Sequence, residues 1–356
     1  MPPQPRKHIE NIFRTLPPDP RPEGHLRLNM NENPDGLPAQ FVRSVLEKVT
    51  PDLLASYPSC RELTELLARS LDFDPAGVLV TNGSDAAIKR IFEAFVAPGD
   101  RVLLTDPTFA MYPVYCELFQ AERVPAPYRD LVNFPFDAFL REIGNAPKLA
   151  VIVNPNNPTG SKLEQDKIQV ASERCAERGV LLIVDEAYHH YLGETSLPLA
   201  RGMDNVLVLR TFSKLCGLAA LRAGFALGHP DLIRRLFTVS PTFDVNGLAV
   251  LFCTELLKHP DIIEGQKKLV EEGRKYLAGA LDRAGVGYHQ GHGNFVLIDV
   301  GEKADSILKA LEAGNVHVSG GFRQDFLRNY IRVTLGGPET MKKFMGVFLE
   351  VLKPAG

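Results

Sequence analysis

The stretch Val206-Leu207-Val208-Leu209-Arg210-Thr211-Phe212-Ser213-Lys214 decides the fold. Its first four residues are aliphatic, which is typical of a strand buried on both faces. Two other stretches have the same form: Leu181-Leu182-Ile183-Val184 runs into Asp185, and Ala150-Val151-Ile152-Val153 runs into Asn154. Such runs alternate with helical patterns between residues 78 and 238. This alternation predicts a mostly parallel sheet with helices on both faces.

Polar side chains follow these three strands directly. Lys214 comes after the first, Asp185 and Tyr188 after the second, and Asn157 lies in the Pro- and Asn-rich loop 154–160 after the third. In α/β sheets, ligands bind outside the carboxyl ends of the strands. An amine, a carboxylate and two hydrogen-bond donors match the aldehyde, ring nitrogen and phenolic oxygen of pyridoxal phosphate. We therefore expect a pyridoxal phosphate site at this edge of the sheet.

A second group of residues has the chemistry of a phosphate site. Thr211 and Ser213 precede Lys214, and Arg222 follows eight residues later; hydroxyls and a guanidinium bind phosphate oxygens well. This context favours a cofactor lysine over the surface cation that a lysine after a strand usually is. Ser84 and Asp85 join a strand to a helix, where backbone amides also bind phosphate, although either residue is equally explained as a helix cap.

Two further residues stay open from their sequence context alone. Phe109 follows the strand expected at 102–105, and it either stacks on a planar ring or belongs to the core. Arg332 lies inside the strand expected at 330–335, where an unpaired arginine is rare. Its partner is therefore either a substrate carboxylate or a carboxylate of the protein.

The 356-residue chain is long enough for two domains. Residues 1–30 are Pro-rich and are expected to form an arm that packs with the smaller domain or with a partner subunit. Residues 31–240 carry the strand–helix alternation and form the large cofactor-binding domain. Residues 241–356 combine long helices with short strands, and we expect a smaller α+β domain.

Composition narrows the function classes. The net charge of −3 gives no general attraction to nucleic acid or to anionic membranes. No run of about 18 apolar residues is present, so we expect no membrane span. The five cysteines lack C-x-x-C spacing and are expected to be reduced. With no apolar signal segment at the N-terminus, these features favour a cytoplasmic protein.

Taken in order, the motifs resemble those of the fold-type I pyridoxal-phosphate aminotransferases, in particular the class-II branch that contains histidinol-phosphate aminotransferase. The resemblance runs from about residue 29 to residue 336. Besides the strand-end motifs, it rests on Asn31-Glu32-Asn33-Pro34, Ser56-Tyr57-Pro58, Pro107-Thr108-Phe109, Gly217-Leu218-Ala219-Ala220-Leu221-Arg222 and Ile331-Arg332-Val333-Thr334. It implies an α/β fold with a seven-stranded, mostly parallel sheet between helices, a smaller α+β domain, and a homodimer with sites at the subunit interface.

The resemblance also implies roles for individual residues. Lys214 would form the Schiff base and move protons, and Asp185 would pair with the ring nitrogen. The ring oxygen and ring face would contact Tyr188, Asn157 and Phe109. The phosphate would contact Ser84, Asp85, Thr211, Ser213, Arg222 and Tyr57 of a partner subunit. Arg332 would bind the substrate carboxylate.

The chain departs from this family at two places. Histidinol-phosphate enzymes usually have an arginine where this chain has Ser319 or Gly320, and Arg323, a few residues later, is a candidate replacement in substrate binding. The pair His189-His190 is also atypical, and we expect it at the surface or in an interface.

The implied reaction is a ping-pong transfer of an amino group between an amino acid, or histidinol phosphate, and a 2-oxo acid. A pyridoxal-phosphate decarboxylase, lyase or cyclase similar to threonine-phosphate decarboxylase is the alternative, because it uses the same scaffold. A transcriptional regulator with an aminotransferase-like domain is disfavoured, since the arm is too short and not basic enough for a DNA-binding module. No G-x-G-x-x-G follows any strand, which disfavours a nicotinamide dehydrogenase.

Overall fold

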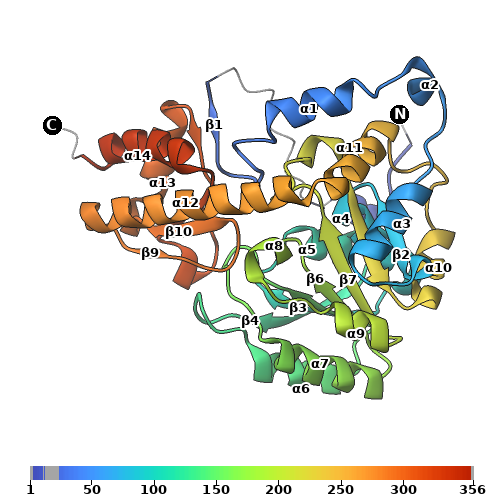
Figure 1. The fold of residues 1–356 in the computed structure, drawn as a ribbon. Helices are drawn as coiled ribbons and strands as arrows, with labels where there is room; N and C mark the ends of the chain where they lie inside the picture. The colour runs from blue at the N-terminus through green and yellow to red at the C-terminus, as the bar shows by residue number, and fades with distance from the viewer. Residues whose placement is uncertain (1–2, 11, 13–23, 354–356) are drawn as a thin grey trace.

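The computed structural model describes residues 3–10, 12 and 24–353, and its largest layer is a seven-stranded sheet (Figure 1). The strand order is β2-β8-β7-β6-β5-β3-β4, and every neighbouring pair is parallel except the two that involve β8. The mostly parallel sheet predicted from the sequence is therefore confirmed. Its strands are β2 (Val78–Thr81), β3 (Arg101–Asp106), β4 (Glu122–Pro127), β5 (Leu149–Val153), β6 (Leu181–Asp185), β7 (Val206–Thr211) and β8 (Gly224–Gly228).

Helices cover both faces of this sheet. Successive residues of a strand point to opposite sides, so the continuous apolar strands put apolar side chains on both faces. Val184 and Val208 belong to one core, whereas Ile183 and Leu209 belong to the other. The first core includes α1 (Ala39–Leu46), α3 (Arg61–Ser70), α6 (Phe136–Gly144), α7 (Gln165–Glu177), α9 (Leu197–Gly202) and α11 (Gly247–Lys258). The second includes α4 (Gly83–Phe95), α5 (Met111–Leu118) and α10 (Pro230–Thr238).

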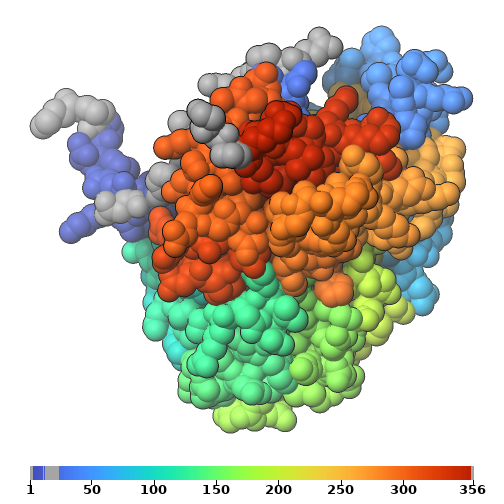
Figure 2. Space-filling model, turned by 90° about the vertical axis from the view of Figure 1, so that its left-hand side faces the viewer, coloured from blue at the N-terminus to red at the C-terminus, as the bar shows by residue number. Residues whose placement is uncertain are grey.

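A third core lies in the C-terminal part of the chain, beside the large sheet. The long helix α12, orange in Figure 1, runs from the neighbourhood of α11 to this part, and Figure 2 shows the orange and red segments packed on the green ones. The elements of this part are α12 (Pro260–Ala284), α13 (Ala304–Ala313) and α14 (Pro338–Leu352), with the antiparallel strands β9 (Tyr288–His289), β10 (Phe295–Asp299) and β12 (Tyr330–Thr334).

The N-terminal segment joins the third core through a short parallel pair, in which β1 (Leu26–Arg27) lies beside β11 (Val316–His317). Leu28, the next residue, is buried in that core. The remaining short elements are α2 (Pro51–Ala55), α8 (His189–Leu192) and the 3-10 turns η1 (Lys7–Ile9), η2 (Pro75–Gly77), η3 (Ala219–Leu221), η4 (Gly301–Lys303) and η5 (Asp325–Leu327).

Two features differ from the sequence-based expectations. Strand β4 was not predicted, because Pro125 and Pro127 argue against a central strand; β4 is instead an edge strand, where prolines are tolerated. Helix α11, which we assigned to the second domain, buries Phe252 and Leu256 in the core of the large sheet. Within α12, the first residue buried in the third core is Val270. We therefore propose a domain boundary within α12 rather than near residue 240.

We also expected reduced cysteines and no membrane span. All five cysteines are free, and four of them are buried. Among the described residues, no helix is both long and apolar enough to cross a membrane.

The contact between α12 and the start of α14 predicts a sharp requirement for glycine at position 273. A Cβ added at Gly273 would lie 1.8 Å from the carbonyl oxygen of Gly336. This oxygen belongs to the backbone, so it cannot move aside by a side-chain rotation. Gly273→Ala should therefore lower the free energy of unfolding by about 1–3 kcal/mol, as overpacking does. The measurement is thermal and urea unfolding followed by circular dichroism.

Gly265 provides the matched control, because it lies in the same helix and a Cβ there would meet no atom within 4 Å. Gly265→Ala should leave the protein as stable or raise the free energy of unfolding by up to about 1 kcal/mol. Equal effects of the two substitutions would show that α12 does not pack on Gly336 as described.

Candidate active site

The carboxyl ends of β5, β6 and β7 lie side by side at one edge of the sheet. Asp185 pairs in register with Val153 of β5 on one side and with Leu209 of β7 on the other. The pairing continues past the strands: Asn154 N–H donates to the Asp185 carbonyl at 2.9 Å. This register brings the loop 154–160, residues 185–188 and residues 211–214 to one edge of the sheet. The sequence-based site residues on these segments are thus gathered in one place.

Lys214 is held at this edge by the N-terminal segment. Its Nζ donates to the Met30 carbonyl at 3.1 Å and lies 5.7 Å from the centre of the Tyr188 ring. Burial lowers the pKa of Lys214 to about 8, and the charge of Arg332 acts in the same direction. A lysine with this pKa has a substantial neutral fraction near pH 8, which makes it a good nucleophile for an aldehyde.

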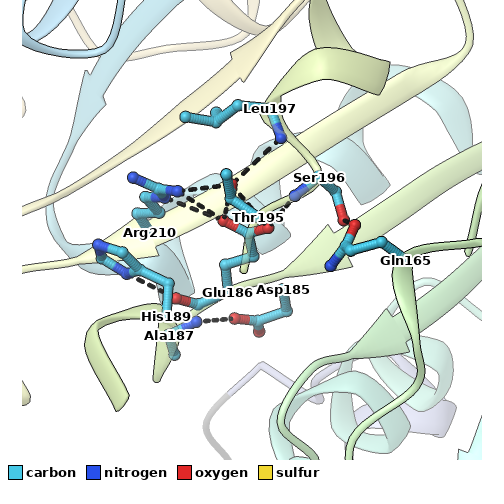
Figure 3. Close-up of polar contacts among 9 residues, drawn as sticks. All are labelled: Gln165, Asp185, Glu186, Ala187, His189, Thr195, Ser196, Leu197 and Arg210. Carbon is cyan, nitrogen blue, oxygen red and sulfur yellow. Dashed lines mark hydrogen bonds and ion pairs between the residues drawn. The ribbon is translucent and has the colours of Figure 1, made fainter. Parts of the chain in front are cut away.

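Asp185 is a buried carboxylate with two donors. Its Oδ2 accepts from the Tyr112 hydroxyl at 3.0 Å, and its Oδ1 accepts from Ala187 N–H at 3.1 Å, the second of which is drawn in Figure 3. Burial raises the pKa of Asp185 to about 6, although both hydrogen bonds and the charge of Lys214 lower it. At neutral pH the group is therefore mostly ionised, as pairing with a protonated ring nitrogen requires.

Arg332 is a buried cation held by uncharged acceptors. It is 8% exposed, and its Nη2 donates to the Asn29 carbonyl at 2.8 Å and to the Ser319 hydroxyl at 3.1 Å. Its Nη1 donates to Asn157 Oδ1, and its buried Nε has no hydrogen-bond partner. No carboxylate among the described residues forms an ion pair with it, so the protein-carboxylate reading is not supported. A cation with an unused N–H fits an anionic ligand.

Tyr188 lies between Lys214 and the third core. Its hydroxyl accepts from Asn31 Nδ2 at 2.8 Å, and its ring packs edge to face on Phe295 at 5.7 Å. Asn31 is held in turn by Thr334, whose Oγ1 accepts from Asn31 N–H at 3.1 Å. The phenol is thus fixed in position beside the lysine.

The expected phosphate ligands also meet. Ser213 Oγ accepts from Arg222 Nη1 at 3.4 Å, and Ser213 N–H donates to Thr211 Oγ1 at 3.1 Å. Gly83 lets the guanidinium reach the start of α4, since a Cβ there would lie 2.7 Å from Arg222 Nη2. The first amides of a helix have no partners within it and favour a phosphate. These amides belong to the turn that contains Ser84 and Asp85; the Oδ1 of Asp85 accepts from Tyr115 at 3.0 Å.

Three predicted residues are less tightly connected. Phe109 is half-buried and meets the ring of Tyr112 edge-on at 6.2 Å. Tyr57 is 79% exposed and stacks on Phe243 at 4.2 Å. Arg323 is exposed and forms no ion pair with any residue in the described part of the chain.

A buried ion pair beside Asp185 was missed by the sequence analysis. Glu186 accepts from Arg210 Nε at 3.0 Å and Nη2 at 2.8 Å, and also from the Thr195 hydroxyl at 2.9 Å and Ser196 N–H (Figure 3). This network ties the segment after α8 to β7. The available signal was one acid and one base at the ends of adjacent apolar strands.

The two histidines after Tyr188 are half-buried, and their expected place at the surface or in an interface stays a prediction. Their ring centres are 3.8 Å apart, and His189 Nδ1 donates to the Glu186 carbonyl at 3.0 Å (Figure 3). Burial lowers the pKa of His190 to about 4 and that of His189 well below its ordinary value. Both rings are therefore neutral at physiological pH.

Comparisons with known proteins agree with this geometry. The fold and the site define a fold-type I enzyme that depends on pyridoxal phosphate. The family model for aminotransferase class I and II matches residues 23–348, and the chain belongs to this family. The comparisons do not favour the decarboxylase, lyase or cyclase alternative.

Individual relatives give the same result. The histidinol-phosphate aminotransferase of Symbiobacterium thermophilum is 34% identical over 99% of this chain and 95% of its own length. That of Thermoanaerobacter sp. (strain X514) is 31% identical over 92% of this chain and 93% of its own. A crystal structure of histidinol-phosphate aminotransferase from Sinorhizobium meliloti with pyridoxal-5'-phosphate has a TM-score of 0.84, at 22% identity, and covers 91% of this chain and 90% of that one.

The buried pair Glu186–Arg210 predicts a large loss of stability when one partner is removed. Arg210→Met leaves the Glu186 carboxylate buried without its cation, so the free energy of unfolding should fall by about 3–5 kcal/mol. Arg174→Met is the control, since Arg174 pairs with Glu177 at 2.8 Å on the exposed face of α7 and should cost no more than about 1 kcal/mol. Urea unfolding of both variants measures the difference, and equal losses would contradict a buried, coupled pair.

Proposed function

We propose that this aminotransferase takes its amino group from histidinol phosphate and passes it to a 2-oxo acid in a ping-pong cycle. The observation that carries the proposal is Arg332, a buried cation with an unused N–H next to the amine of Lys214. In histidinol phosphate the phosphate ester occupies the place that the carboxylate has in an amino acid. One guanidinium therefore suits the anionic group of either substrate. The two bacterial relatives described above are histidinol-phosphate aminotransferases, which supports this donor.

The residues present fit the cofactor that the family requires. Bound pyridoxal phosphate supplies an aldehyde and a ring that accepts electrons. Asp185 would hold the ring nitrogen, and Tyr188 and Asn157 the ring oxygen, while Phe109 would cover the ring. Ser84, Asp85, Thr211, Ser213 and Arg222 would hold the phosphate. The donor set matches in charge at both ends, with a carboxylate for a cationic nitrogen and a guanidinium for an anionic phosphate.

Lys214 is the side chain that would bind the cofactor aldehyde and move protons. Its Nζ would hold the cofactor through the aldehyde. With a pKa of about 8, the amine of Lys214 would also be able to accept a proton from the carbon that bears the amino group of the donor. The carbonyl of Met30, 3.1 Å away, orients this amine without adding a negative charge that would raise its pKa.

We propose that two copies of the chain form a dimer and that Tyr57 of each reaches the phosphate in the other. Tyr57, Leu54 and Phe243 are large apolar side chains that are more than half exposed. Exposed apolar groups gathered in one place mark an interaction surface. We also propose a cytoplasmic setting, which is supported by the five cysteines that form no disulfide.

Lys214→Ala tests the lysine. The variant should lose the visible absorbance that wild type acquires with pyridoxal phosphate, and borohydride should fix no cofactor on it. In the wild type, the rate of colour formation should rise with pH up to about 8 and then level off, because the neutral amine is the reactive form. Lys268→Ala, on the exposed face of α12, is the control. A Lys214→Ala variant that kept the colour and the adduct would refute the assignment.

Titration of the coloured enzyme with amines tests the donor. Histidinol phosphate should convert the absorbance to that of the pyridoxamine form at lower concentration than aromatic amino acids, glutamate or phosphothreonine. Arg332→Met should raise KM for both the donor and the 2-oxo acid by about 10-fold to 100-fold, the value of a hydrogen-bonded charge. It should change cofactor affinity much less.

Arg323→Met separates the two arginines. If Arg323 reaches the phosphate of the donor, as we propose, the variant raises KM for histidinol phosphate and leaves that of the 2-oxo acid unchanged. Unchanged values for both substrates would remove Arg323 from the site. No conversion by histidinol phosphate in the wild type, with conversion by another amine, would overturn the proposed donor and retain the transaminase.

A further inference from the structure

Tyr112 is a buried phenol that contacts the site from behind. It lies in the first turn of α5 and is 0% exposed, and its hydroxyl donates to Asp185 Oδ2 at 3.0 Å. Burial and the negative charge of Asp185 raise the pKa of Tyr112 well above its ordinary value. The phenol therefore keeps its proton at every physiological pH and acts toward the carboxylate only as a donor.

The carboxylate is held from two sides. Tyr112 binds Oδ2 from α5, and Ala187 N–H binds Oδ1 at 3.1 Å from the segment after β6. Two donors from different elements fix the plane of the carboxylate, not only its position. Each carboxylate oxygen accepts more than one hydrogen bond, so lone pairs remain for a further donor.

We propose that Tyr112 is a positioning residue for Asp185, which holds the carboxylate ionised and oriented to pair with the protonated ring nitrogen of the cofactor. The inference rests on the proposed function, because it takes Asp185 as the partner of the ring nitrogen. The hydroxyl of Tyr112 is hydrogen-bonded to Asp185, so its effect on the cofactor would be indirect. It acts through Asp185.

The charges around Asp185 show why this hydrogen bond matters. Burial works against ionisation, and so does the like charge of Glu186, whereas Lys214, Ala187 N–H and Tyr112 favour it. The negative charge of Asp85 also acts on Tyr112. The pKa of Asp185 is about 6, so loss of one favourable donor moves protonation of the carboxyl toward neutral pH. A protonated carboxyl cannot neutralise a cationic ring nitrogen.

Position 112 allows a clean test. The ring of Tyr112 packs edge-on against Phe109 with an interplanar angle of 83°. Tyr112→Phe keeps that ring and the packing of α5, and removes only the hydroxyl. Two ligands are compared on the full-length protein: pyridoxal phosphate and its analogue in which a C–H replaces the ring nitrogen. Both carry the aldehyde and the phosphate, so the ratio of their affinities cancels the contributions of Lys214 and Arg222.

Tyr112→Phe should weaken pyridoxal phosphate by about 10-fold or more, the effect of losing a hydrogen bond to a charged group, and leave the analogue nearly unchanged. In wild type the preference for pyridoxal phosphate should fall as the pH drops through about 6, and in the variant this fall should begin at higher pH. Equal weakening of both ligands, or an unmoved pH midpoint, would overturn the proposal. Tyr128→Phe, which removes a buried hydroxyl bonded to Ser161, should change both ligands equally.

Two further variants keep the outcomes distinct. Asp185→Asn should abolish the preference for pyridoxal phosphate over the analogue; if it does not, the assignment of Asp185 in the proposed function fails. If Asp185→Asn abolishes the preference and Tyr112→Phe does not, only the role of Tyr112 fails. If Tyr112→Phe does not accumulate as folded protein, difluorotyrosine placed at position 112, a stronger donor, should shift the pH midpoint downward. An unchanged midpoint would then overturn the role.

Discussion

Asp185 and Arg332 are buried and Lys214 is half-buried at one edge of the large sheet, and this placing of three charges away from bulk water is the constraint on which the rest of the site depends. Burial raises the pKa of the acid to about 6 and lowers that of the lysine to about 8. Both pKa values therefore lie closer to pH 7 than usual. At that pH each group can exchange a proton, and the neutral form of the lysine can bind an aldehyde. Arg332 cannot respond in this way, because a guanidinium stays charged. It must instead collect acceptors from several segments.

The kind of acceptor decides what a buried arginine can do. Arg210 faces the carboxylate of Glu186, so its charge is neutralised within the protein and it fastens the segment after α8 to β7. Arg332 is held by a carbonyl, an amide and a hydroxyl, so it is fixed in place with its charge still available. The N-terminal segment supplies two such uncharged acceptors. The Asn29 carbonyl accepts from Arg332, and the Met30 carbonyl accepts from Lys214. Uncharged acceptors preorganise a cation without competing with the anion that it is to bind.

Sequence reasoning located the parts of the site that the sheet itself positions. Asp185 and Lys214 follow apolar strands, and strand ends in a parallel sheet meet at one edge whatever the loops do. Tyr112 was not found, because an aromatic residue in a helical stretch has the signature of a core residue, and its hydroxyl finds Asp185 only when α5 packs on the sheet. Asn31 was recognised only as part of a motif. Its contact with Tyr188 joins segments 157 residues apart, and no local pattern encodes such a distance.

Cofactor binding depends on residues at strand ends, whereas substrate choice depends on residues in loops. Residues 319–324 lie outside the described helices and strands apart from one isolated bridge, Ser319 to Arg332. This segment crosses from the third core to the large sheet, where Gln324 Nε2 donates to Asp106 Oδ1 at 3.1 Å. Loops of this kind accept substitutions more readily than strand ends, because fewer backbone hydrogen bonds depend on them. Ser319 is the exception in this segment, because its backbone and its hydroxyl both bond to Arg332, so a substitution there would change the surroundings of Arg332 and leave the strand ends that carry Asp185 and Lys214 in place.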